Sequence, residues 1–139
     1  MKFTIPGEPC GKARPRVVHN GNFSRAYTPE KTVNYETLVK LEYQRQCGDA
    51  YISEGGIHMN IVARFTIPNS ASKRKAVAMA DGTIRPTKKP DCDNIIKIVC
   101  DALNGIAYKD DAQIVSVSIE KRYAVMPSVE VTLQEVCSG

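Results

Sequence analysis

Hydrophobic and polar residues alternate in three stretches of the chain, and this period of two predicts half-buried β-strands. The clearest stretch is Ile57 to Ile67, in which every second residue from Ile57 to Phe65 is apolar. Gln113 to Tyr123 and Ser128 to Val136 alternate in the same way. Because only a short turn around Met126-Pro127 separates them, we expect these two strands to form an antiparallel pair.

The first residues predict another short strand, Lys2 to Ile5, which ends at Pro6-Gly7. About twenty residues rich in Gly, Pro and Arg follow, and we expect them to be irregular. Long ordered loops in small domains tend to be functional. The run Gly11-Lys12-Ala13-Arg14-Pro15-Arg16 is therefore a candidate ligand-contacting arm.

Two helices are predicted between the first strand and residue 80. The first has Thr28 as N-cap and Pro29 at its first position, continues to Gln46 and ends at Gly48. Its apolar face is broad and irregular, comprising Val33, Tyr35, Leu38, Val39, Leu41 and Tyr43. The second is a short basic helix, capped by Ser70 or Ser72 and running through Met79, before a turn at Asp81-Gly82.

A third helix is predicted from about Asn94 to Leu103, with Asp93 as N-cap and Asn104-Gly105 at its end. Its many apolar positions predict a buried helix with one functional edge. Strands with a helix inserted before the final pair predict an α+β fold with a mixed or antiparallel sheet and two main helices. At 139 residues, we expect one domain over 1–139.

Composition excludes several classes of protein and site. The N-terminus has no apolar signal segment and no run of about 18 apolar residues occurs, so we expect a cytoplasmic protein without a membrane span. Five dispersed cysteines predict reduced, mostly buried thiols and no zinc site: Cys10, Cys47, Cys92, Cys100 and Cys137. His19 and His58 are too isolated for a His-based metal site or a Ser-His-Asp triad.

Positive charge gathers in two regions of the chain. Residues 1–31 carry six bases against two acids, a net charge of +4, and residues 64–97 carry eight bases against three acids, a net charge of +5. The whole chain carries only +4, so the remaining residues are net negative. Three basic clusters lie mostly beside Gly, Pro or Ser, which indicates exposed loops able to follow phosphates. Their bases are Lys12, Arg14, Arg16, Lys73, Arg74, Lys75, Lys88 and Lys89. The plainer interpretation is a solvated surface.

Carboxylates gather in the second region, at Asp91 and Asp93, where the third helix is expected to begin. An N-cap needs one carboxylate, so Asp91 is a second acid beside the first. Lys97 follows Asp93 by one helical turn, and the pair could form a simple salt bridge worth about 0.3 to 0.5 kcal/mol. Asp101 continues the same edge and is expected to be structural.

A second acidic pair, Asp110-Asp111, falls in the short connection after this helix. Asp is common in turns, so the pair alone is a weak signal. Together with Asp91 and Asp93 it indicates a site of hard oxygen ligands, which suits Mg²⁺ or Mn²⁺.

These residues occur in an ordered pattern. The pattern comprises Asp91-Cys92-Asp93-Asn94-Ile95-Ile96-Lys97, then Cys100-Asp101-Ala102-Leu103-Asn104-Gly105, then Tyr108-Lys109-Asp110-Asp111-Ala112-Gln113-Ile114-Val115. It closely resembles the signature of the RusA-like Holliday junction resolvases, which phages and prophages often encode, and the early Gly11 to Arg16 run resembles the family's basic loop. Tyr108, Cys92 and Pro90 depart from the residues usual in the family.

The resemblance implies that Asp91, Asp93 and Asp111 bind the metal and that Lys97 is essential, while Asp110 and Asp101 support them. It also implies a homodimer, because symmetric cutting of a four-way junction needs two active sites. The leading hypothesis is a Mg²⁺-dependent endonuclease that resolves four-way junctions in DNA recombination and repair. Two alternatives stay open: a nuclease for flaps or other branched DNA, and a non-catalytic DNA-binding protein.

Overall fold

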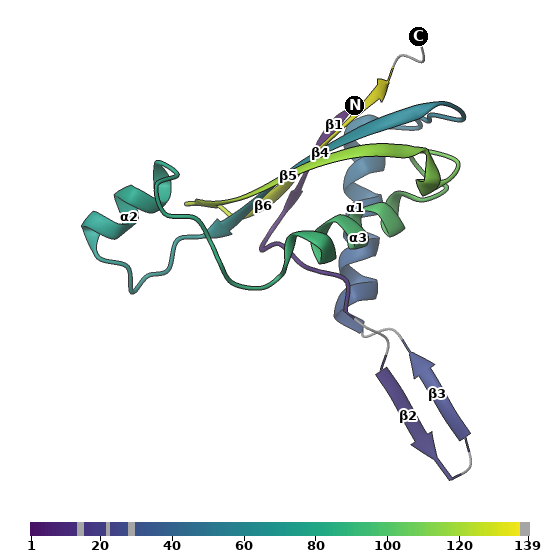
Figure 1. Cartoon of the computed structure of the whole chain (residues 1–139), viewed down its shortest axis with the longest axis horizontal. Helices are drawn as coiled ribbons and strands as arrows, with labels where there is room; N and C mark the ends of the chain where they lie inside the picture. The colour runs from purple at the N-terminus through teal and green to yellow at the C-terminus, as the bar shows by residue number, and fades with distance from the viewer. Residues whose placement is uncertain (14–15, 22, 28–29, 137–139) are drawn as a thin grey trace.

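A computed structural model of the protein describes residues 1–13, 16–21, 23–27 and 30–136, and for residues 16–20 and 23–27 it describes the backbone alone. Four strands form one mixed sheet in the order β1-β6-β4-β5 (Figure 1). They are β1 (Lys2–Pro6), β4 (Gly56–Thr66), β5 (Ile114–Ala124) and β6 (Ser128–Val136). β6 pairs antiparallel with both β1 and β4, whereas β5 pairs parallel with β4. The predicted α+β class is confirmed.

The predicted pairing of the last two strands is wrong. β5 and β6 run in opposite directions, but β4 lies between them and pairs with both. Alternation identifies a strand and its buried face, but it does not encode which strand lies next to it. The parallel pairing of β4 with β5 requires a crossover, and the connection of residues 67–113 is long enough to provide one.

Two helices, α1 (Glu30–Cys47) and α3 (Cys92–Leu103), share one core with the inner face of the sheet. The inner residues of β4 are at most 2% exposed, as its alternation predicts: Ile57, Met59, Ile61, Ala63 and Phe65. α1 buries a narrower face than predicted, comprising Thr32, Tyr35, Val39 and Tyr43. Val33 and Leu41 are 48% and 58% exposed, because only this one stripe of α1 meets β1 and α3.

The segment after β1 is not wholly irregular, which corrects another prediction. Its backbone forms a hairpin of β2 (Arg16–Asn20) and β3 (Phe23–Tyr27), with Asn20 opposite Phe23. Figure 1 shows the hairpin apart from the main sheet. The loop between the paired residues Asn20 and Phe23 is two residues long and begins with Gly21, whose positive φ of 64° such tight turns favour. The predicted cap Thr28 and first helical residue Pro29 lie outside the described residues.

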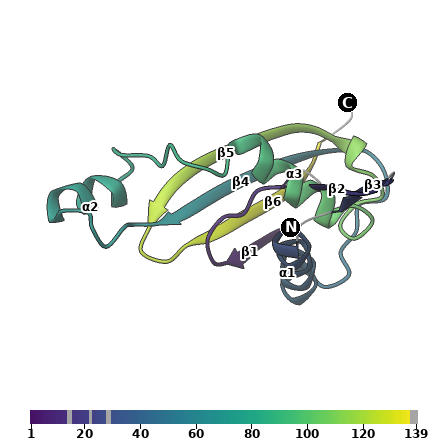
Figure 2. The same cartoon turned by 90° about the horizontal axis from the view of Figure 1, so that it is seen from below.

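The crossover from β4 to β5 contains α2 (Lys73–Ala80), α3 and the short 3₁₀ helix η1 (Asp111–Gln113). Ser72 caps α2, since its hydroxyl accepts a hydrogen bond of 3.3 Å from the backbone N–H of Lys75. None of the eight described residues of α2 is buried. In both views α2 lies beyond one end of the sheet, away from α1 and α3 (Figure 1, Figure 2).

The four described cysteines are all free thiols, as predicted, but only Cys10 is buried. Cys47, Cys92 and Cys100 are partly exposed, and Cys137 lies outside the described residues. Within the described part of the chain, no helix combines the length and the apolar character needed to cross a bilayer.

Candidate active site

The acidic motif lies at the beginning of α3, two residues earlier than predicted. The helix begins at Cys92, so its N-cap is Asp91 and not Asp93. Asp91 has extended backbone angles, and its carboxylate accepts no capping hydrogen bond from the described helix. Asp93 lies in the first turn, where the helix dipole favours a negative charge. Asp91 occupies the N-cap position but makes no capping hydrogen bond, so helix capping does not explain its carboxylate.

Asp91 and Asp93 line a pocket of about 730 Å³ between the start of α3 and the segment that follows β1. The pocket mixes these acids with lysines from three parts of the chain: Lys12, Lys31 and Lys89. Paired acids beside several cations suit a ligand that carries phosphate together with a bound cation.

Close backbone packing brings the early basic run to this pocket. Lys12 N–H donates to the Asn94 carbonyl at 2.9 Å, and Ala13 N–H donates to Thr32 Oγ1 at 3.3 Å. A Cβ atom on Gly11 would lie 2.8 Å from Pro90 Cβ and 3.0 Å from Asn94 Cβ. Only glycine fits here without a shift, so Gly11 allows this segment to lie directly against the start of α3.

Lys12 is held by acids and is not an open basic group. Its Nζ lies 2.5 Å from Glu36 Oε1 and 3.4 Å from Asp101 Oδ2, and its side chain is 20% exposed. Burial opposes its charge, but hydrogen bonds and charge from Glu36 and Asp101 outweigh burial and raise the pKa of Lys12. The ion cluster joins α1 to α3 through Asp101, which has the supporting position expected of it.

Lys97 lies one turn after Asp93 and is exposed. The simple salt bridge between Asp93 and Lys97 that the sequence allowed is not formed among the described residues. The ammonium group therefore lies at the surface next to the acidic motif, where an added phosphate could reach it.

Asp110 and Asp111 have different surroundings. Asp110 caps η1: its carboxylate accepts from Ala112 N–H at 2.9 Å, while its own N–H donates to Gln113 Oε1 at 3.0 Å. The Ala112 N–H is the main cause that lowers the pKa of Asp110. Contact with the Asp110 carboxyl, then burial and the charges of Asp110 and Asp101, raise the pKa of Asp111. Asp110 stabilises the turn, whereas the Asp111 carboxylate is crowded by other acids.

The three predicted metal ligands do not form a closed cluster. In the described part of the chain, no group of three or more His, Cys, Asp or Glu side chains is close enough to hold a metal. Asp91 and Asp93 share the pocket, whereas Asp111 lies beyond the other end of α3, where its N–H donates to Asn104 Oδ1 at 3.1 Å.

The chain matches the family model described as Endodeoxyribonuclease RusA over residues 6–134. It is also similar to a Bacillus subtilis (strain 168) protein named Uncharacterized protein YqaN, with 37% identity over 139 residues, covering 98% of this chain and 96% of that protein. The chain belongs to the RusA endodeoxyribonuclease family.

Membership in the RusA family implies nuclease chemistry. The family match includes the Asp91 to Lys97 run, Asp111 and the Gly11 segment. Mg²⁺ is commonly bound through one or two carboxylates, with waters and substrate phosphates as its other ligands. The open Asp91–Asp93 pair fits this pattern of oxygen donors, and it does not fit a closed zinc site.

The structure places the other predicted DNA-contacting residues of this RusA family member in two regions. Lys73, Arg74 and Lys75 form the exposed first turn of α2, and Lys88 and Lys89 lie exposed just before the acidic motif. Arg14 lies outside the described residues, and only the backbone of Arg16 is described.

Several residues around the candidate site were not predicted from the sequence. Glu36 and Thr32 lie on α1, and each binds the segment that follows β1. Lys31, at the start of α1, lines the pocket beside Asp91. No local motif marks these residues, because they reach the site only through the packing of α1 against α3.

Proposed function

We propose that the protein is a Mg²⁺-dependent, structure-selective endodeoxyribonuclease that resolves four-way DNA junctions in recombination and repair. The observation that carries the proposal is the Asp91–Asp93 pair, which lines a pocket with Lys31 and Lys89 and makes no capping or salt-bridge contact among the described residues. Membership in a family of endodeoxyribonucleases supports the same chemistry.

Asp91 and Asp93 are the carboxylates that would hold Mg²⁺ or Mn²⁺ at the pocket, and Asp111, near the other end of α3, is the third acid that the family resemblance assigns to the metal. Such an ion supplies a nucleophile at neutral pH and offsets negative charge on the phosphate. Lys97 stabilises the charge that develops on the phosphate or the leaving oxygen. Lys31 and Lys89 orient the phosphate at the pocket, and Gly11 allows the pocket wall to lie close to α3.

Binding of the junction arms falls to bases outside the pocket. Lys73, Arg74 and Lys75 on α2, with Lys88, contact phosphates and read no base sequence. Cutting both strands symmetrically requires two sites, so we propose a homodimer whose two-fold axis matches that of the junction.

Cleavage of a synthetic four-way junction, with and without Mg²⁺, tests this function. We expect metal-dependent paired cuts that disappear in Asp93→Asn while junction binding persists, because an amide keeps the shape but loses the charge. Asp49→Asn, which changes another exposed acid, is the matched control. Normal cutting by Asp93→Asn would refute the assignment. Faster cutting of flaps would indicate a different substrate, and binding without cutting would indicate a non-catalytic protein.

A further inference from the structure

The segment of residues 82–90 leads from α2 to the catalytic acids and has few apolar anchors. Pro86 is its one buried residue. A segment with so little buried surface depends on polar contacts to keep one conformation. The contacts that hold this segment therefore help to set the position of the backbone at Asp91.

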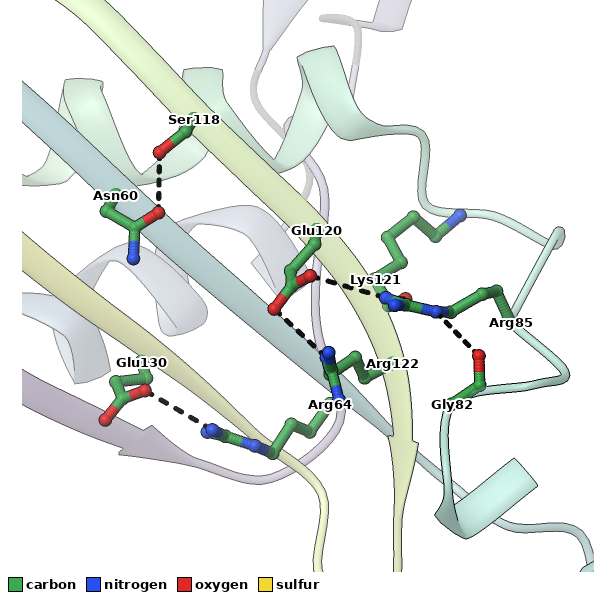
Figure 3. A network of polar contacts seen from close by, with 9 residues as sticks. All are labelled: Asn60, Arg64, Gly82, Arg85, Ser118, Glu120, Lys121, Arg122 and Glu130. Carbon is green, nitrogen blue, oxygen red and sulfur yellow. Dashed lines mark hydrogen bonds and ion pairs between the residues drawn. The ribbon is translucent and has the colours of Figure 1, made fainter. Parts of the chain in front are cut away.

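β5, the edge strand of the described sheet, supplies several of those contacts, and Ile84 N–H also donates to the carbonyl of Ala78 in α2 at 3.0 Å. The Arg85 guanidinium donates to the carbonyl of Gly82 at 3.0 Å and to the carbonyl of Lys121 at 3.3 Å, and it lies 3.4 Å from Glu120 Oε2 (Figure 3). Glu120 is also paired with Arg122 at 3.0 Å. Arg85 thus fastens the start of the segment to an edge that no other strand covers among the described residues.

Lys121 fastens the other end. Its Nζ donates to the carbonyl of Lys88 at 2.5 Å, three residues before Asp91. The same ammonium lies 5.2 Å from the centre of the Phe65 ring, and Phe65 is 2% exposed. Lys121 is therefore itself held by a buried aromatic residue of β4 while it binds the segment.

Asp91 needs such support more than Asp93 does. Asp93 lies within α3, so the packing of the helix sets its position. The Asp91 carbonyl accepts from Ile95 N–H at 3.1 Å, but Asp91 has an extended backbone and its carboxylate makes no capping bond, so the direction of that carboxylate also depends on the segment before it. On the opposite side, Gly11 packs against Pro90 and Asn94. Asp91 is thus held between the Gly11 segment and the contacts from β5.

We propose that Lys121 and Arg85 are positioning residues that hold Asp91 in its working place by fastening residues 82–90 to the edge of the sheet. The inference rests on the proposed function, since it gives these residues a part in the same reaction. A displacement of about 1 Å in a reacting group can cost about 100-fold in rate, so loss of either contact should reduce cleavage far more than stability.

Single-turnover cleavage of a saturating four-way junction with Mg²⁺ tests the role of Lys121. For Lys121→Met we expect a rate at least about tenfold lower, with junction affinity within about twofold of wild type. Lys121→Arg keeps a donor and should recover most of the rate. Lys40→Met removes a lysine from α1 and is the matched control. A wild-type cleavage rate for Lys121→Met overturns the proposal. So does a reduced rate that is seen only at low junction concentration and returns to the wild-type value when the junction is saturating, because Lys121 would then act only in binding.

Hydrogen exchange gives a readout that does not depend on activity. In Lys121→Met, exchange of the backbone amides in residues 82–91 should accelerate, while exchange in α1 and β4 stays at the wild-type rate. Arg85→Met is a second variant with the same expected result, in case Lys121→Met fails to fold. Unchanged exchange in residues 82–91 overturns the proposal. If the wild-type protein cuts no junction, the proposed function fails, and exchange still decides whether these contacts hold the segment.

Discussion

Asp93 and Lys97 lie one turn apart on α3, and within the described part of the chain they form no ion pair. If Lys97 stabilised the helix through an ion pair with Asp93, Lys97→Ala would lower the free energy of unfolding. We expect instead a change of less than about 0.5 kcal/mol in the free energy of unfolding, as is common for exposed charges. The cleavage rate should fall by about 100-fold, because charge stabilisation at the phosphate is lost.

Urea unfolding and single-turnover cleavage of the same Lys97→Ala preparation measure both quantities. Lys40→Ala provides the matched loss of a lysine from another helix. If Lys97→Ala cuts at the wild-type rate, its ammonium has no part in the reaction.

Asp110 and Asp111 predict opposite results on substitution. Asp110→Ala removes the cap of η1 and should lower the melting temperature while cleavage persists. Asp111→Ala removes a carboxylate that no capping bond uses among the described residues, so cleavage should be lost with little change in stability. Thermal unfolding and junction cleavage of the two variants decide between these roles. The assignment fails if Asp110→Ala is the inactive variant and Asp111→Ala cuts normally.

Glu130 predicts a pH-dependent contribution to stability. Its carboxylate lies 2.9 Å from Lys2 Nζ and 3.3 Å from Arg64 Nη2 (Figure 3 shows the Arg64 contact). The hydrogen bond from Lys2 is the main cause that lowers the pKa of Glu130 in the folded protein, and Arg64 adds to it. A lowered folded-state pKa stabilises the protein above the unfolded pKa of about 4.3, and this stability is lost as pH falls through the folded value.

Glu130→Gln should therefore be less stable than wild type by about 1 kcal/mol at pH 7, and the difference should shrink toward zero below about pH 4. Urea unfolding at several pH values measures it, with the exposed Glu54→Gln as control. A difference that stays constant with pH would mean that the charge of Glu130 contributes nothing.

The exposed first turn of α2 predicts the salt dependence of DNA binding. Each phosphate contact contributes about 0.9 to the slope of the logarithm of affinity against the logarithm of salt concentration. Replacing Lys73, Arg74 and Lys75 together by Ala should lower that slope by up to about three. The helix should still fold, since none of its described residues is buried. Titrations of junction binding at several salt concentrations test this, and an unchanged slope would mean that the turn is only solvated.

The strands and the acidic motif could be predicted from the sequence because each has a local signal. The alternation of β4 identified its buried face, and the Asp91 to Lys97 run pointed to the candidate site. The position of β4 between β5 and β6 has no such signal, since pairing depends on contacts between distant segments.

The surroundings of single charges were harder to predict for the same reason. Lys12 has the sequence context of a phosphate-binding loop, yet it lies between Glu36 and Asp101, which only the packing of α1 on α3 brings together. The cap at Asp91 was missed by two residues because both Asp91 and Asp93 are good capping residues. Local propensity could not choose between them.

The parallel pairing of β5 with β4 has a consequence for how the protein folds. Every acid of the candidate site, together with Lys97, lies in the single crossover of residues 67–113. The chain must lay down that whole crossover before β5 can reach its partner, and such non-local pairings form slowly. We therefore expect the candidate site to become ordered no earlier than β5 pairs with β4, so a partly synthesised chain that lacks β5 also lacks the ordered site.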